Sequence, residues 1–344
     1  MAHRILLAAG GTGGHIMPSI AFGKYLMRCG ETVEWLAGSR PLEGEIYSAH
    51  GIEPSRLPLE GSPLGVRDFR TVKRCFQLIG SFFESRRLLK RFKADACVLF
   101  GGYISIPVMM AAKSLGVKIL MHEQNAVAGK ATRLAAKLGI PIACAWETCT
   151  GIPESARTNV GMPLRDMELI DRKTAQARLL GAPLPDGERL IAILGGSLGS
   201  KGLKSVLQSV GNVLKSSGCR ILCMGIKNED RPFREAIAHE AVWDMSTVYS
   251  AADAVICRAG ASTLAEIAAL GIPAIVVPWS QSADGHQLKN AEIFSEMTGA
   301  PVLPENSSHD DFIAALAQLP QRRPPEDMGA GQARLREALN GLIG

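Results

Sequence analysis

The sequence predicts an α/β protein built from two Rossmann-like domains, each with a parallel sheet, that face one another across a cleft. A strand, a glycine-rich turn and a helix follow one another at the start of the chain, and the same order restarts near residue 190. Such alternation is typical of parallel sheets with helices on both faces. The 344 residues are enough for two domains that each have their own core.

In the first half, short apolar runs predict buried strands, and glycine-rich turns and helical segments separate them. The expected strands are Arg4–Ala8, Thr32–Ala37, Ala94–Phe100 and Lys118–His122, and the expected helices are Met17–Cys29 and Ile104–Leu115. Gly30 marks the end of the first helix, because glycine readily adopts the left-handed conformation that often follows a helix.

The second half repeats this pattern. Its expected strands are Leu190–Leu194, Asp253–Cys257 and Pro273–Val277, and its expected helices are Gly202–Lys215 and Thr263–Leu270. Between the halves, Gly151–Arg165 is rich in Gly, Pro, Asn and Thr and predicts the domain boundary, and prolines mark a second break at Leu319–Asp327. We therefore expect a first domain at 1–160, a second at 161–327, and a closing helix within 328–344 that packs back on the first.

The composition predicts a globular cytoplasmic protein. Hydrophobic residues make up 47% and charged residues 21%, and no apolar run approaches the roughly 18 residues that a membrane span needs. The eight cysteines form no CxxC pair, and the seven histidines lack metal-ligand spacing. We therefore expect reduced core thiols, no metal site and no cofactor.

Basic residues concentrate between Arg67 and Lys93. This segment holds nine basic and two acidic residues, a balance of +7 in a chain whose net charge is +5. Aromatic residues such as Phe76 and Phe83 lie between the charges. A basic, aromatic-rich helix suits an anionic membrane surface, and an ordinary helix that packs its apolar side on a sheet would have the same pattern. Both interpretations remain open from this segment.

Two glycine turns predict close approach of the backbone to a phosphate or a sugar. Gly10–His15 fails the nicotinamide pattern, because Ile16 occupies the third glycine position and the second strand is followed by no acid that could hold a ribose. Gly195–Lys201 fails the ATP-binding pattern, because Ser200 precedes the lysine. For both turns, binding of a phosphate or diphosphate remains as the functional interpretation, and a simple tight turn of an α/β fold remains as the alternative.

Thr263–Glu266 also allows two interpretations. Its Thr-x-x-Glu spacing matches a capping box, in which the Glu266 carboxylate accepts a hydrogen bond from the N-cap amide. Alternatively, Glu266 faces the cleft and accepts hydrogen bonds from both hydroxyls of a ribose.

Taken together, the motifs resemble one family in their order and spacing. The motifs are Gly10–His15, Gly101–Tyr103, His122–Asn125, Gly195–Gly199, Cys257–Glu266, and Asp284–Gln287 with Asn290–Ala291. They are similar to those of the MurG family, which transfers N-acetylglucosamine from UDP to the lipid-linked muramyl pentapeptide lipid I to give lipid II. The resemblance covers nearly the whole chain and implies a GT-B fold with inverting chemistry.

The resemblance also assigns expected roles to individual residues. In the second domain it implies that Glu266 holds the ribose, Ser197 lies at the diphosphate, Gln287 contacts the sugar hydroxyls, and the Val242 backbone reads uracil. Arg165, Arg258 and the run Ala261, Ser262, Thr263, Leu264 and Ala265 lie at or near the donor. In the first domain it implies a substrate face of Thr12, Gly13, Gly14 and Asn125, with His15 as the candidate base.

Three positions depart from the family pattern, namely Met162, Leu198 and Trp243. The expected partners are UDP-N-acetylglucosamine, lipid I and the anionic inner face of the cell membrane, with no nucleic acid. Two alternatives are a different GT-B enzyme, such as a glycolipid synthase or a UDP-sugar epimerase, and a nucleotide-sugar-binding module without catalysis.

Overall fold

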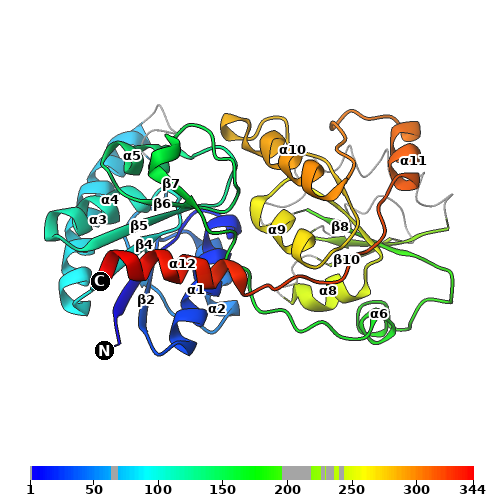
Figure 1. Cartoon of the computed structure of the whole chain (residues 1–344), viewed down its shortest axis with the longest axis horizontal. Helices are drawn as coiled ribbons and strands as arrows, with labels where there is room; N and C mark the ends of the chain where they lie inside the picture. The colour runs from blue at the N-terminus through cyan, green and yellow to red at the C-terminus, as the bar shows by residue number, and fades with distance from the viewer. Residues whose placement is uncertain (1, 63–68, 196–217, 226–228, 230–235, 240–243) are drawn as a thin grey trace. The chain divides into compact units, whose positions relative to one another are not determined.

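The computed structural model describes residues 2–62, 69–195, 218–225, 229, 236–239 and 244–344. The chain forms two compact units. The first unit consists of Met1–Arg165 together with Met328–Gly344, and the second consists of Asp166–Asp327 (Figure 1). Each unit has its own parallel sheet, which confirms the predicted α/β class with two parallel-sheet domains.

The sheet of the first unit has seven parallel strands in the order β3-β2-β1-β4-β5-β6-β7. They are β1 Arg4–Ala8, β2 Thr32–Ala37, β3 Ser55–Arg56, β4 Ala96–Leu99, β5 Lys118–Glu123, β6 Ile142–Cys144 and β7 Arg157–Asn159. Strand β4 is apolar and fully buried, and β1 is so after its exposed first residue, Arg4, as expected for a parallel sheet that helices cover on both faces.

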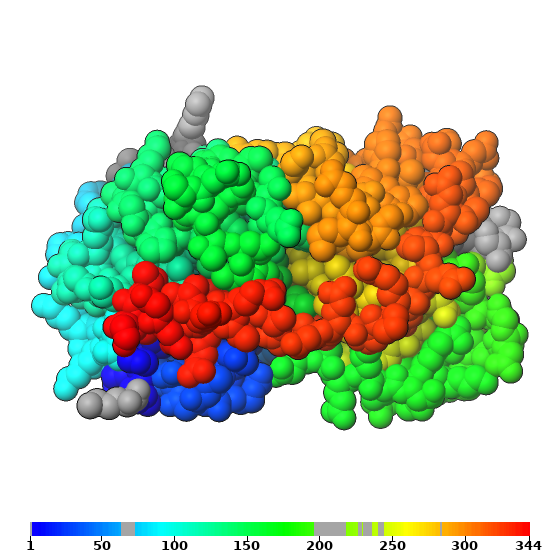
Figure 2. Space-filling view, in the orientation of Figure 1, coloured from blue at the N-terminus to red at the C-terminus, as the bar shows by residue number. Residues whose placement is uncertain are grey.

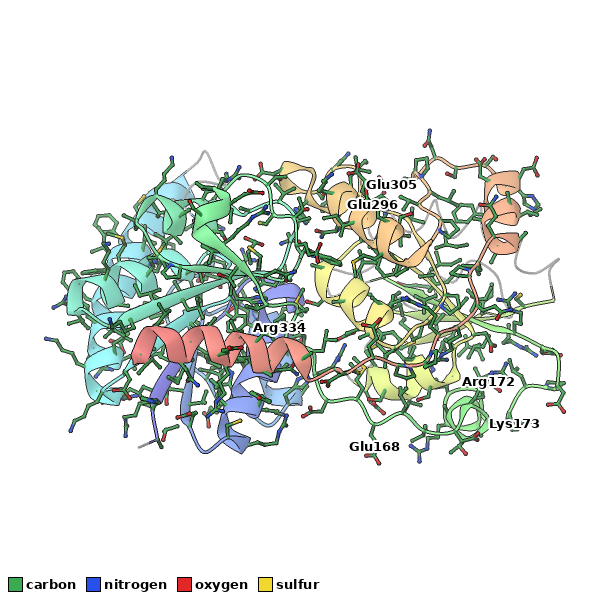
Figure 3. The ribbon with its side chains drawn as sticks, in the orientation of Figure 1. Glu168, Arg172, Lys173, Glu296, Glu305 and Arg334 are labelled. Carbon is green, nitrogen blue, oxygen red and sulfur yellow. The ribbon has the colours of Figure 1, made fainter. Side chains whose placement is uncertain are left out.

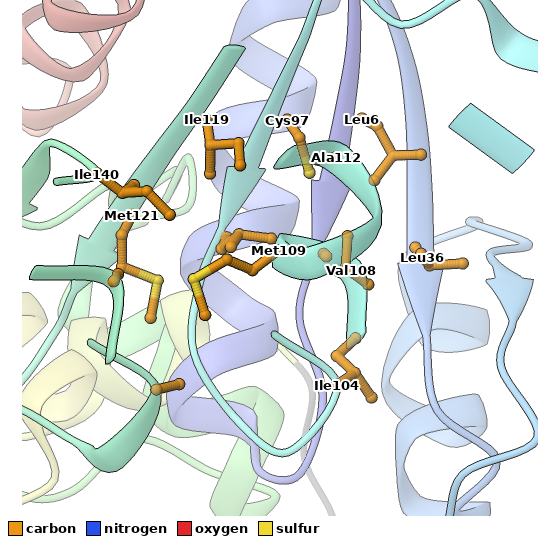
Figure 4. Packing of buried hydrophobic residues seen from close by; sticks show 14 of the residues in the cluster. Leu6, Leu36, Cys97, Ile104, Val108, Met109, Ala112, Ile119, Met121 and Ile140 are labelled. Atoms are coloured by element: carbon orange, nitrogen blue, oxygen red, sulfur yellow. The ribbon is translucent and has the colours of Figure 1, made fainter. Parts of the chain in front are cut away.

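Helices cover both faces of this sheet. They are α1 Gly13–Arg28, α2 Pro41–Ala49, α3 Phe69–Phe92, α4 Ser105–Leu115, α5 Lys130–Lys137 and α12 Ala330–Ile343. Because neighbouring residues of a strand point to opposite faces, Leu6 packs in one core cluster and Leu7 in the other. In the first cluster, Val108 and Met109 of α4 lie against the sheet near Cys97 (Figure 4).

The last helix, α12, belongs to the first unit although more than 160 residues separate it from the rest of that unit in sequence. It packs against α1 and β5, and Figure 2 shows it lying across this face of the unit. Leu335 and Leu339 are fully buried, and the Arg334 Nε–H donates to the Val160 carbonyl at 2.9 Å. At Gly331, a Cβ would lie 2.2 Å from the Met162 carbonyl oxygen, so only glycine allows this close packing.

The second unit has a five-stranded parallel sheet in the order β10-β9-β8-β11-β12. The strands are β8 Leu190–Leu194, β9 Arg220–Met224, β10 Ile237–His239, β11 Ala254–Cys257 and β12 Ala274–Val276, and the helices are α6 Arg172–Leu180, α8 Met245–Ala251, α9 Ala261–Ala269, α10 His286–Thr298 and α11 His309–Ala317. Arg172, labelled in Figure 3, donates to Asp253 at 2.7 Å, and the same carboxylate oxygen accepts the Leu190 amide. This contact ties α6 to the starts of β8 and β11.

Several elements differ from the sequence predictions, among them β7, α1 and α9. Gly151–Arg165, expected as a linker, contains β7, whose polar Arg-Thr-Asn sequence forms an edge strand without an apolar signal. Helix α1 begins at Gly13, four residues before the predicted start, and α9 begins two residues before its predicted start. The predicted helix Gly202–Lys215 lies outside the described residues.

Candidate active site

The first predicted turn lies between β1 and α1. Thr12 is the N-cap, with extended backbone angles, and Gly13 is the first helical residue. The N-terminus of this 16-residue helix therefore points at the carboxyl edge of the sheet, where ligands of parallel sheets bind.

A buried carboxylate, Glu43 of α2, holds this turn in place. It is 0% exposed and accepts hydrogen bonds from the Gly11 amide at 2.8 Å, the Gly38 amide at 2.7 Å and the Tyr103 hydroxyl at 2.5 Å. Burial raises the pKa of Tyr103, and the bond to Glu43 raises it further, so the phenol remains a donor. Glu43 thus links the segments that follow β1, β2 and β4. No motif in the sequence singles out Glu43, whose local signal is its place as the acid in the first turn of α2.

His15 lies at the end of a chain of hydrogen bonds. Its Nδ1 is 2.8 Å from Gln124 Oε1, Gln124 Nε2 is 2.9 Å from His122 Nδ1, and His122 Nε2 is 3.1 Å from the Gly161 carbonyl oxygen. Burial lowers the pKa of His122 to about 4, although the hydrogen bond to Gly161 and the charge of Glu123 oppose the shift. His122 is therefore neutral at physiological pH.

The loop after β5 is organised by a second buried carboxylate, Glu123. Its oxygens accept from the Asn125 amide at 3.0 Å, the Asn125 side chain at 3.2 Å, the Gly129 amide at 3.0 Å and the Thr132 hydroxyl at 2.5 Å. Glu123 therefore fixes the position of Asn125 and joins the loop to the start of α5.

In the second unit, Glu266 lies in the second turn of α9 and is 4% exposed. The helix begins at Ala261 with Gly260 as its N-cap, and no side chain caps it. The capping-box interpretation of Thr263–Glu266 is therefore wrong. The Glu266 carboxylate instead accepts a hydrogen bond from the buried hydroxyl of Tyr249 at 2.8 Å.

Arg258 follows β11 and holds neighbouring loops together. Its guanidinium donates to the Val277 carbonyl at 3.1 Å and to Glu305 at 2.6 Å, and Glu305 also accepts from the Ser280 amide and hydroxyl. Burial alone would raise the pKa of Glu305, but the hydrogen bonds from Ser280 and Arg258 outweigh it and lower the pKa. Figure 3 labels Glu305 in this part of the unit.

Gln287 lies in the first turn of α10 and contacts the segment that follows β12. Its side-chain oxygen, Oε1, accepts from the Trp279 backbone amide at 2.9 Å, and its backbone N–H donates to Ser282 Oγ at 3.2 Å. Three residues later, the Asn290 side chain donates to the Ala259 carbonyl at 3.1 Å. These bonds bring the start of α10 to the turn that precedes α9.

The predicted residues thus fall into two groups, one in each unit. The first unit gathers Thr12, Gly13, Gly14, His15 and Asn125 at the carboxyl edge of its sheet, and the second gathers Arg258, Gln287 and the run Ala261–Glu266. Arg165 is half-buried and is the last residue of the first unit before the chain enters the second. Ser197 and Val242 lie outside the described residues.

Two family models match the chain. Residues 5–139 match the glycosyltransferase family 28 N-terminal domain, and residues 190–339 match the glycosyltransferase family 28 C-terminal domain. Each model falls largely within one of the two units.

Curated relatives match across nearly the full length. A protein of Azotobacter vinelandii is 33% identical over 98% of this chain and 94% of its own length, and one of Pseudomonas fluorescens Pf-5 is 34% identical over 92% and 88%. Both carry the name UDP-N-acetylglucosamine--N-acetylmuramyl-(pentapeptide) pyrophosphoryl-undecaprenol N-acetylglucosamine transferase.

Solved structures show the same fold. The crystal structure of Acinetobacter baumannii MurG has a TM-score of 0.68 at 26% identity and covers 99% of both chains. A UDP-GlcNAc 2-epimerase from Methanocaldococcus jannaschii has a TM-score of 0.65 at 13% identity, covers 99% of this chain and is covered along its whole length, so it shows shared fold alone.

The buried His122 predicts a pH dependence of stability. Its pKa is 6.5 in the unfolded chain and about 4 in the folded one, so between these values the unfolded state binds a proton that the folded state does not. The contribution of His122 to the free energy of unfolding is therefore fully present above pH 6.5, and it is lost as the pH falls toward 4. We expect protonation of His122 to lower the free energy of unfolding by about 2 kcal/mol between pH 7 and pH 5.

Urea unfolding of the wild type and of His122→Asn at both pH values should show a smaller loss of stability in the variant. The control His309→Asn, at an exposed site, should behave as wild type. Equal losses in wild type and His122→Asn would contradict the prediction.

Proposed function

The chain belongs to the MurG family of N-acetylglucosamine transferases, and from this premise we propose how its own residues carry out the reaction. The protein transfers N-acetylglucosamine from UDP-N-acetylglucosamine to lipid I, giving lipid II and UDP in peptidoglycan biosynthesis. The observation that carries this conclusion is the match to relatives of this activity along nearly the full length of both chains. Both units are therefore part of the similarity.

The acceptor face lies in the first unit in this proposal. The attacking 4-hydroxyl of the muramyl sugar must lose a proton as it displaces UDP, and the single displacement inverts the anomeric carbon. His15 is the proposed base, since an imidazole can take up a proton near neutral pH. Thr12, Gly13 and Gly14 place it at a helix start, and Asn125, held by Glu123, contacts the acceptor.

The donor is held by the second unit in this proposal. Glu266 accepts hydrogen bonds from the ribose hydroxyls, and Gln287 contacts the sugar, where its NH₂ group is the donor because its oxygen binds the Trp279 amide. Arg258 keeps the surrounding loops in place through Glu305. The family resemblance assigns Ser197 to the diphosphate and Val242 to the uracil, and it assigns Arg165 and the run Ala261–Ala265 to the surroundings of the donor. The positive end of the α9 dipole favours the developing charge of UDP.

A transfer assay tests the function directly. Radiolabelled N-acetylglucosamine should move from UDP-N-acetylglucosamine to a short-chain lipid I analogue, with a β-1,4 linkage and one UDP released per sugar. His15→Ala should lower kcat by about 10²–10⁴-fold, the usual contribution of a general base. Donor consumption without acceptor would indicate an epimerase instead. Donor binding without turnover on any lipid acceptor would indicate a binding module.

The role of Glu266 makes a separate prediction. Glu266→Ala should lower kcat/KM for the donor by about 10- to 150-fold, which corresponds to roughly 1.5–3 kcal/mol for hydrogen bonds to a charged group. The variant should also bind UDP and 2′-deoxy-UDP almost equally in competition assays. Tyr249→Phe is the matched control, because it removes the bond between the two side chains and keeps the carboxylate. A wild-type preference for UDP in Glu266→Ala would leave Glu266 a structural residue.

We also propose that α3 attaches the protein to an anionic membrane at the cytoplasmic face. The helix buries Ser81, Ser85, Leu88 and Leu89, as an ordinary packed helix would. Its opposite side exposes an outer stripe of Phe76, Ile79 and Phe83, which are 71%, 56% and 63% exposed. From residue 73 onward, where the side chains of the helix are described, the exposed basic residues are Lys73, Arg87, Lys90 and Arg91. Within the described ranges, no helix combines the length and apolar character needed to cross a bilayer.

The outer stripe of α3 predicts binding to vesicles. The protein should sediment with vesicles that contain phosphatidylglycerol and less with neutral ones, and added salt should release it because exposed charges are screened. Replacing Phe76, Ile79 and Phe83 by Ser, or Lys90 and Arg91 by Glu, should abolish sedimentation while activity on a water-soluble acceptor survives. The control replaces three exposed residues elsewhere, Met27, Met297 and Ile313, by Ser. Equal sedimentation with both kinds of vesicle would contradict the proposal.

A further inference from the structure

We propose that Gln124 is a positioning residue that fixes His15 in the tautomer with a bare Nε2, the form that can accept a proton. The inference deepens the proposed function, because it concerns the base of that reaction. It rests on the direction of each hydrogen bond between His15 and the Gly161 carbonyl.

The direction is set at the far end of the chain. The Gly161 carbonyl oxygen can only accept, so His122 Nε2 must carry a hydrogen. His122 is fully buried and neutral, so its Nδ1 has a lone pair and must accept. It accepts from Gln124 Nε2 at 2.9 Å, so the NH₂ group of the glutamine side chain must face His122.

A second bond keeps the Gln124 amide from turning over. Its NH₂ group also donates to the His122 carbonyl at 2.9 Å. If the amide were reversed, Oε1 would face that carbonyl oxygen and the lone pair on His122 Nδ1, two repulsive contacts in a site where Gln124 is only 2% exposed. Oε1 therefore points to His15.

An amide oxygen can only accept, so the 2.8 Å contact requires a hydrogen on His15 Nδ1. Neutral His15 then has its lone pair on Nε2. Neutral histidine in water favours the opposite form, with the hydrogen on Nε2, which could not act as a base through that atom. Gln124 therefore reverses the ordinary preference of the imidazole.

The position of the ring is restricted as well. At Gly101, where φ is +87°, a Cβ would lie 3.0 Å from both Cε1 and Nδ1 of His15. Glycine therefore lets the ring sit close to the backbone on its Nδ1 side. His122 and Gln124 are buried, whereas His15 is partly exposed, so His15 is the end of this chain of hydrogen bonds that a substrate can reach.

Nitrogen NMR of histidine-labelled protein tests the proposal without relying on turnover. In the wild type near pH 8, the two-bond proton couplings of His15 should identify Nδ1 as protonated and Nε2 as bare. In Gln124→Met, which keeps the length of the side chain and removes its hydrogen bonds, His15 should shift toward the Nε2-protonated form. In the variant, kcat should also be lower by about 5- to 10-fold, the usual contribution of one hydrogen bond, and the KM for UDP-N-acetylglucosamine should be unchanged.

The matched control is Gln176→Met in the second unit. Gln176 is equally buried, and its amide also pairs at both ends, with the Leu184 amide and the Ala251 carbonyl. This variant should keep the His15 tautomer and the wild-type kcat. A wild-type enzyme with His15 protonated on Nε2, or a Gln124→Met variant with wild-type tautomer and kcat, would overturn the inference. A wild type without transferase activity would instead contradict the proposed function and leave the tautomer result standing.

Discussion

The loops at the carboxyl edge of the first unit's sheet depend on one requirement, that backbone amides withdrawn from water must find hydrogen-bond acceptors. In the first unit, buried carboxylates supply them. Glu43 accepts from the Gly11 and Gly38 amides, which follow β1 and β2, and Glu123 accepts from amides of the loop after β5. An acid is suited to this task because one carboxylate can accept several bonds at once.

This arrangement separates the residues that shape the loops from those that face a substrate. Glu43 and Glu123 are almost fully buried, whereas Thr12, His15 and Asn125 remain partly exposed. Bonds to a charged acceptor are stronger than those between neutral groups, so the loops are held in place without substrate. Groups that are positioned before binding lose less freedom on reaching the transition state.

The sequence predicted the parts of the fold that depend on local composition. Strands Arg4–Ala8, Thr32–Ala37 and Leu190–Leu194 match the structure residue for residue, because apolar runs bounded by polar or glycine residues leave little freedom in assignment. The polar strand β7 has no such signal and was missed. At the site, the order of motifs identified the family. The contacts of Glu43 with Tyr103, of Gln124 with His15 and of Glu266 with Tyr249 depend on long-range packing, which the sequence did not reveal. The Thr263–Glu266 spacing even favoured a local cap that does not form, because the helix begins earlier, at Ala261.

The return of α12 to the first unit affects the order in which the protein can fold during synthesis. The chain leaves this unit at Arg165 and comes back only at Met328, so a ribosome makes the entire second unit before the first can be completed. Until then, the surface of α1 and β5 on which α12 packs lacks the cover of Leu335 and Leu339. Apolar surface of this kind binds chaperones and promotes aggregation. Release of the last helix from the exit tunnel is thus the event that closes the first core.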